Sequence, residues 1–72
     1  MSDYLAVLEK AKDGSWSAYV PDLPGCTSAG KTRDEVAKNV RDAIELYLEE
    51  IRSEGKAAPS PSSLPEMVHI GG

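Results

Sequence analysis

The sequence predicts an α+β domain in which a small antiparallel sheet is followed by one long helix. Three observations support this class. Two strand-like apolar runs flank an Asp-Gly pair, a proline-containing loop follows them, and a long stretch then repeats apolar side chains at helical spacing. A last apolar run near the C-terminus predicts one more strand, which gives the element order β-β-β-α-β.

The first two strands are expected at residues 4–10 and 16–20. Asp13-Gly14 favours a tight hairpin between them, since glycine accepts the positive φ of such turns. A two-residue turn places Leu8 opposite Tyr19. One face then holds Leu5, Val7, Trp16, Ala18 and Val20, and the other holds Tyr4, Ala6, Leu8 and Tyr19. Because both faces contain apolar groups, each needs a cover.

The segment after the second strand is a loop with two prolines. Pro21 ends the strand because proline has no backbone N–H to donate to a neighbouring strand. Pro24-Gly25 is a pair typical of tight turns. Asp22 is interpreted as a turn former, since aspartate bonds its own backbone in turns. Residues 26–29 form a short third strand that Gly30 breaks.

The helix is expected to begin after Thr32, with Glu35 completing a capping box. Gly55 is the expected C′ residue. Apolar side chains between these signals recur at spacings of three and four, which defines one stripe. The stripe consists of Val36, Val40, Ala43, Ile44, Tyr47, Leu48 and Ile51. One helix covers one face of a small sheet and leaves the other face to something else.

Beyond the helix, residues 57–65 form a connector rich in serine and proline, which favours an extended path. Met67-Val68-His69-Ile70 is expected to return as the last strand. The 72 residues therefore form a single domain. A chain this short with one cysteine has no disulfide to stabilise it, so we expect a homo-oligomer, a dimer or higher.

The net charge of −4 argues against direct nucleic-acid binding and favours a basic protein partner. Neither a signal peptide nor a membrane span is indicated, and one unpaired cysteine suits a reducing interior, so the expected location is the cytoplasm.

Side chains that do chemistry are few. His69 is the only histidine and is expected to be a partly exposed residue of the last strand. Cys26 has no partner cysteine and is expected to be buried as a small apolar group. The helix acids Asp42, Glu45, Glu49 and Glu50 are interpreted as a solvated face that is partly paired at i,i+4. We therefore expect no catalytic residues, no metal site and no cofactor.

Several features together resemble one family. They are the opening Tyr4-Leu5-Ala6-Val7-Leu8-Glu9, the Asp13-Gly14 hairpin, the loop Pro21-Asp22-Leu23-Pro24-Gly25-Cys26, Thr32 with Glu35, and Gly55 with prolines beyond it. In this combination the chain resembles the N-terminal HicB-like domain of antitoxins from HicA–HicB toxin–antitoxin systems. The resemblance covers nearly the whole chain, residues 1–72, and implies a degraded ribonuclease-H-like fold without catalytic residues.

The resemblance implies a non-catalytic antitoxin that occludes a small basic RNA-cleaving toxin, HicA. Family members commonly have a second, DNA-binding domain, and we expect none here. Two alternatives stay open: an orphan homo-oligomer without a toxin, and a residual metal-dependent nuclease. The expected partner or oligomer contacts are Tyr4, Ala6, Leu8 and Tyr19, from the sheet face that the helix leaves bare.

Overall fold

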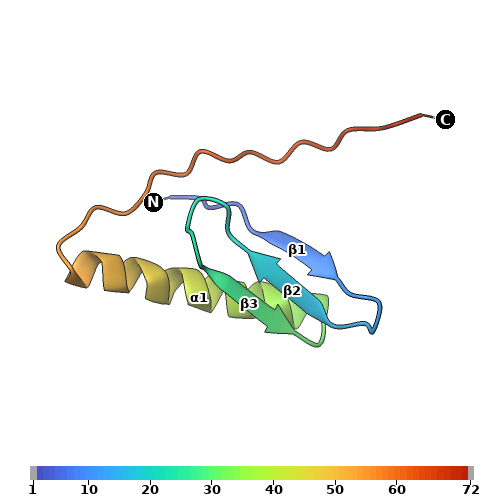
Figure 1. Ribbon diagram of the computed structural model, residues 1–72, viewed down its shortest axis with the longest axis horizontal. Helices are drawn as coiled ribbons and strands as arrows, with labels where there is room; N and C mark the ends of the chain where they lie inside the picture. The colour runs from blue at the N-terminus through green and yellow to red at the C-terminus, as the bar shows by residue number, and fades with distance from the viewer. Residues whose placement is uncertain (1, 72) are drawn as a thin grey trace.

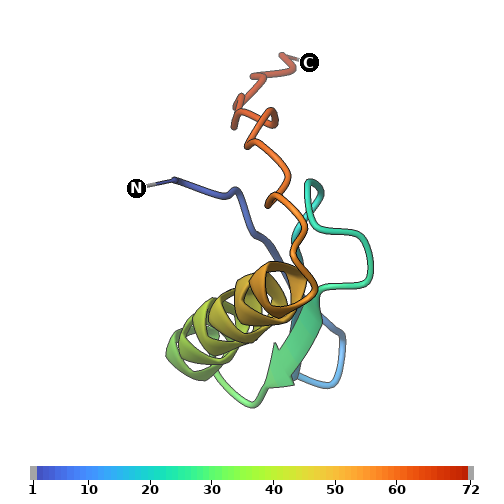
Figure 2. The ribbon, with the colours of Figure 1, turned by 90° about the vertical axis from the view of Figure 1, so that its left-hand side faces the viewer.

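The computed structural model describes residues 2–71. Its elements are β1 (Val7–Lys10), β2 (Trp16–Tyr19), β3 (Thr27–Gly30) and α1 (Arg33–Ser53). The strands form one antiparallel sheet in the order β1-β2-β3, and α1 lies across one of its faces (Figures 1 and 2). The predicted α+β class, with three strands followed by one long helix, is confirmed.

The predicted last strand is wrong for the single chain. Met67-Val68-His69-Ile70 lies in a stretch without helix or strand that begins after Gly55 and continues to residue 71. Figure 1 shows this C-terminal segment as an extended trace that leaves the domain. A strand needs a neighbour for its backbone hydrogen bonds, and the sheet of the described residues has only three members.

The hairpin between β1 and β2 has a three-residue loop, so the predicted two-residue turn and its register are wrong. The amide of Gly14 donates to the carbonyl of Ala11, and Gly14 has a φ of 91°. Leu8 consequently pairs with Ala18 and Val7 pairs with Tyr19, one residue away from the expected alignment. A slip of one residue moves every side chain of a strand to the opposite face relative to its neighbour.

The ends of α1 follow the predicted capping signals. Thr32 is the N-cap, and its hydroxyl accepts the amide of Glu35 at 3.0 Å. The Glu35 carboxylate reaches back to the amide of Lys31 rather than to that of the N-cap, at 2.9 Å. At the other end Gly55 has a φ of 75° and donates to the carbonyl of Arg52, as expected for a C′ glycine.

The core lies between the sheet and the first half of α1. Leu23 and Val36 are fully buried, and Ala18 of β2 is buried in the same cluster. Six side chains form the buried cluster: Ala18, Val20, Leu23, Cys26, Val36 and Val40. Most of the other stripe residues of α1 are only half-buried. The domain therefore depends on a small number of contacts, as chains of this size do.

Gly30 is where the helix comes closest to the sheet. A Cβ atom added at this position would lie 2.7 Å from the backbone nitrogen of Val36 and 3.1 Å from its Cα. Next to it, the side-chain amide of Asn39 donates to the carbonyl of Ala29 at 2.8 Å. The absence of a side chain at Gly30 thus sets the distance between α1 and β3.

Gly30→Ala is expected to destabilise the domain by about 1–3 kcal/mol, the usual cost of overpacking, because the obstructing atoms belong to the helix backbone. Urea unfolding followed by the helical circular dichroism signal measures this loss. Gly71→Ala is the control, since open space surrounds that position. Equal stability of the two variants would contradict the proposed close approach.

Candidate partner-binding surfaces

The loop from Pro21 to Cys26 is two consecutive turns that place one side chain in the core. The amide of Leu23 donates to the carbonyl of Val20 at 3.0 Å, and the amide of Cys26 donates to that of Leu23 at 3.0 Å. Gly25 supplies the positive φ of 82° in the second turn. Leu23 is thereby buried completely. The motif is a structural anchor that joins β2 to β3.

Asp22 lies in the same loop but does more than form a turn, which corrects the interpretation from sequence. One of its oxygens accepts the backbone amides of Ser62 and Ser63, at 2.9 and 3.0 Å. The other accepts their hydroxyls, at 2.9 and 3.1 Å. These bonds, with the Ser62 amide as the largest cause, lower the pKa of Asp22 to about 2. The connector is thus tied to the motif loop across 40 residues of sequence.

A second contact ties the connector to the start of the chain. The hydroxyl of Tyr4 donates to the carbonyl of Pro59. Ala57 and Pro59 also lie against the last turns of α1, near Tyr47 and Ile51. The connector therefore follows a defined path from the end of α1 past the N-terminal segment to Asp22, and only the residues after Ser63 leave the domain.

The open sheet face is the side of the sheet that faces away from α1 (Figure 2). The strand pairing places Val7, Tyr19 and Thr27 in one row across it. Its members are Val7, Glu9, Ser17, Tyr19, Thr27 and Ala29. Tyr19 is 43% exposed and is the only aromatic side chain among them. Its predicted location on the uncovered face is confirmed, and its role in an interface remains a prediction.

Tyr4, Ala6 and Leu8 lie elsewhere, so the prediction that they share the bare face with Tyr19 is wrong. All three pack against the buried core cluster, because the three-residue loop turns Leu8 toward the helix together with Ala18. They line a hollow of about 380 Å³ beside the outer edge of β1. We call this hollow the β1-edge groove; its apolar lining residues are Tyr4, Ala6, Leu8, Ala37, Val40 and Ile44.

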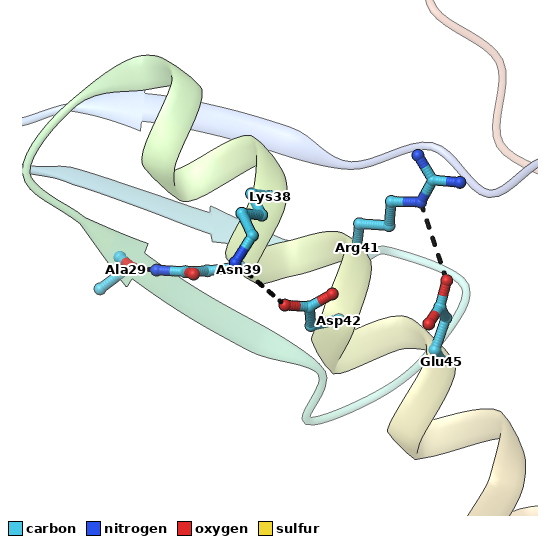
Figure 3. Close-up of polar contacts among 6 residues, drawn as sticks. All are labelled: Ala29, Lys38, Asn39, Arg41, Asp42 and Glu45. Carbon is cyan, nitrogen blue, oxygen red and sulfur yellow. Dashed lines mark hydrogen bonds and ion pairs between the residues drawn. The ribbon is translucent and has the colours of Figure 1, made fainter.

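The outward surface of α1 is polar and partly paired, as the sequence predicts. Lys38 lies 4.0 Å from Asp42, and Arg41 lies 3.7 Å from Glu45 (Figure 3). All four side chains are more than half exposed, and such pairs contribute little to stability. The surface of the helix therefore offers charge rather than a shaped site.

The candidate reactive side chains do not meet. Cys26 is buried as predicted, and burial raises the pKa of its thiol, which disfavours the nucleophilic thiolate. His69 is exposed on the C-terminal segment rather than on a strand. Among residues 2–71, no three His, Cys, Asp or Glu side chains lie close enough together to hold a metal ion. In the same range no helix is long and apolar enough to cross a bilayer.

Comparison of the sequence with known proteins places the chain in a family. The family model described as the HicB-like antitoxin of bacterial toxin–antitoxin systems matches residues 4–70. A UPF0150 protein of Synechocystis is 42% identical over 57 residues, which cover 79% of this chain and 72% of that protein. A UPF0150 protein of Thermoplasma acidophilum is 33% identical over 66 residues, which cover 92% of this chain and 96% of that protein.

Asp22→Ala is expected to release the connector while α1 and the sheet stay folded, because alanine has no side-chain oxygen to accept the two serine amides. Hydrogen exchange measures the release as lost protection at Ser62 and Ser63. Asp13→Ala is the matched control, since Asp13 accepts bonds from Ser15 within the hairpin and the connector residues Ser62 and Ser63 bond to Asp22 instead. Unchanged protection in Asp22→Ala would contradict the tie.

The same bond predicts a pH dependence. The folded pKa of Asp22, about 2, is below its ordinary value, so the contribution of this carboxylate is fully present above about pH 4. It is lost as the pH falls from there through about 2 and the carboxylate gains a proton. Protection of the Ser62 and Ser63 amides should decrease over this range. Protection that is flat across it would refute the assignment.

Proposed function

Because the chain belongs to the family of HicB-like antitoxins of bacterial toxin–antitoxin systems, we propose that it binds a small, basic, HicA-like toxin that cleaves RNA. It neutralises the toxin by covering the surface that RNA has to reach. The match over residues 4–70 is the observation on which this proposal depends. Family membership also favours a non-enzymatic role, so inhibition occurs by occlusion, in the cytoplasm where such a toxin meets its RNA.

The charge of the chain suits such a partner. The chain has twelve acidic and eight basic residues. An RNA-binding toxin needs a positive surface to hold phosphates. Opposite charges speed the encounter of two proteins and suppress wrong partners. The exposed acids of α1 that take no part in its ion pairs, among them Glu49 and Glu50, add to this negative field. Electrostatic attraction therefore brings the toxin close, and a packed contact has to hold it.

The open sheet face is the surface we assign to that contact. It is uncovered by α1 and presents Val7 and Ala29 beside the half-exposed ring of Tyr19. Tyrosine is enriched among the residues that contribute most to binding energy, since it offers a large rigid area with a polar end. A single aromatic side chain on a face whose other members are mostly small, with the exposed carboxylate of Glu9 beside them, is a suitable anchor for a basic partner.

The test of function takes as partner the product of the gene beside this one, provided that the gene encodes a small basic protein. We expect the two purified proteins to form a complex, and RNA cleavage by the neighbour to stop when this chain is added in equal amount. Absence of both complex and inhibition would refute the antitoxin role. RNA cleavage by this chain alone with Mg²⁺ or Mn²⁺ would instead support the nuclease alternative.

Tyr19→Ala is expected to weaken the toxin complex by about 2 kcal/mol, about 30-fold in Kd, while leaving the fold intact because the side chain is 43% exposed. Titration calorimetry measures the change, with circular dichroism as the check of folding. Leu46→Ala is the matched control, since Leu46 is 61% exposed but lies on α1. A toxin that binds both variants with the wild-type affinity would exclude the open sheet face.

A further inference from the structure

The C-terminal segment from residue 64 to residue 70 holds most of the exposed large hydrophobic side chains of residues 2–71. Six such side chains are exposed in that range, and four of them lie in this segment: Leu64, Met67, Val68 and Ile70, at 85%, 94%, 68% and 81%. The radius of gyration is 14.0 Å, against about 11 Å for a compact chain of this length, which agrees with a segment that extends away from the domain. The backbone of this extended segment is not paired in a sheet, so its N–H and C=O groups are open to pairing with another strand.

The path of the connector explains why the segment stands away from its own domain. Asp22 holds Ser62 and Ser63, and Tyr4 holds the carbonyl of Pro59. The next residue, Leu64, is already 85% exposed. In Figures 1 and 2 the segment then continues away from both the sheet and α1. The domain therefore presents its apolar segment outward, where another molecule meets it.

Only one edge of the sheet is able to receive such a strand. β1 and β3 are the two edge strands. At β3 the carbonyl of Ala29 is taken by the side chain of Asn39, and Gly30 lies against the backbone of α1. At β1 the apolar β1-edge groove opens between the strand and the helix, with Ala6 and Leu8 in its lining. A strand added at β1 would place alternate side chains in this groove.

We propose that residues 64–70 of one chain add to β1 of a second copy, with their alternate apolar side chains in the β1-edge groove. Exchange of the same segment in both directions gives a twofold symmetric dimer. Val68 and Ile70 are two residues apart and face the same side of a strand, whereas His69 faces the opposite side. The exchange covers two exposed apolar surfaces at once and enlarges a core of only six buried side chains.

The first experiment measures the mass of the native particle by light scattering over a range of concentrations. We expect the full chain to be a dimer and the double variant Val68→Asp/Ile70→Asp to be a monomer with unchanged helix content, because both side chains are exposed in the single chain. His69→Asp adds a charge to the same segment on its other side and should remain a dimer. A double variant that stays dimeric would overturn the proposal, as would a wild-type chain that is monomeric throughout.

Hydrogen exchange then separates exchange between chains from pairing within one chain. Strand addition protects amides in residues 64–70 and along the outer edge of β1, and this protection should increase with protein concentration together with the mass. Protection that is independent of concentration would mean pairing within a chain and would overturn the proposal. A dimer with an unprotected C-terminal segment would do the same. Neither experiment contains toxin, so its outcome is distinct from that of the antitoxin test.

Discussion

The close approach of α1 to β3 at Gly30 determines which side of the sheet becomes the core and which surfaces stay uncovered. With no side chain at Gly30, the helix backbone near Val36 lies directly against the strand, and Asn39 holds it there through the carbonyl of Ala29. The helix therefore lies over the side of the sheet that bears Ala18 and Val20, which become the core. The opposite side stays uncovered, and so does the edge at β1.

Local signals in the sequence were enough to predict β1, β2, β3 and α1 in their order, although the last strand predicted at residues 67–70 does not form in the single chain. The capping residue Thr32, the terminal Gly55 and the apolar stripe between them predict α1 almost to its observed ends, because helix limits depend on contacts a few residues apart. The ion pairs on its surface are equally local. The burial of Cys26 also follows from its residue type and the absence of any activating neighbour.

These local signals did not determine the register of the hairpin. Asp13-Gly14 is compatible with a two-residue turn and with the observed three-residue loop, which differ in whether Lys12 belongs to the strand or to the loop. The decision is made by the core, where Leu8 and Ala18 pack on the same side. That error moved Ala6 and Leu8 to the wrong face in the prediction, while Tyr19 was assigned correctly. A candidate surface on a sheet is thus only as reliable as the loop that sets the register.

The tie between Asp22 and the connector was also missed, because its partners are 40 residues away and serines give no positional signal in a serine-rich stretch. Leu23, beside it, had one usable signal: it is the only large aliphatic residue in a loop of turn formers. Both residues belong to the motif on which the family resemblance rests. Part of that motif therefore serves to bury a loop and to direct the connector.

The two proposed contacts use different surfaces, and this separation has a physical origin. A three-stranded sheet with one helix leaves two incomplete places, the face away from α1 and the edge at β1, where α1 lines the groove through Val40 and Ile44 but adds no strand. The face offers Tyr19 among mostly small side chains and the carboxylate of Glu9, which suits a basic partner that binds reversibly. The edge offers backbone groups and an apolar groove, which suits a permanent strand. Because the face stays open when the edge is filled, a dimer formed through the C-terminal segments would still present two faces to toxin.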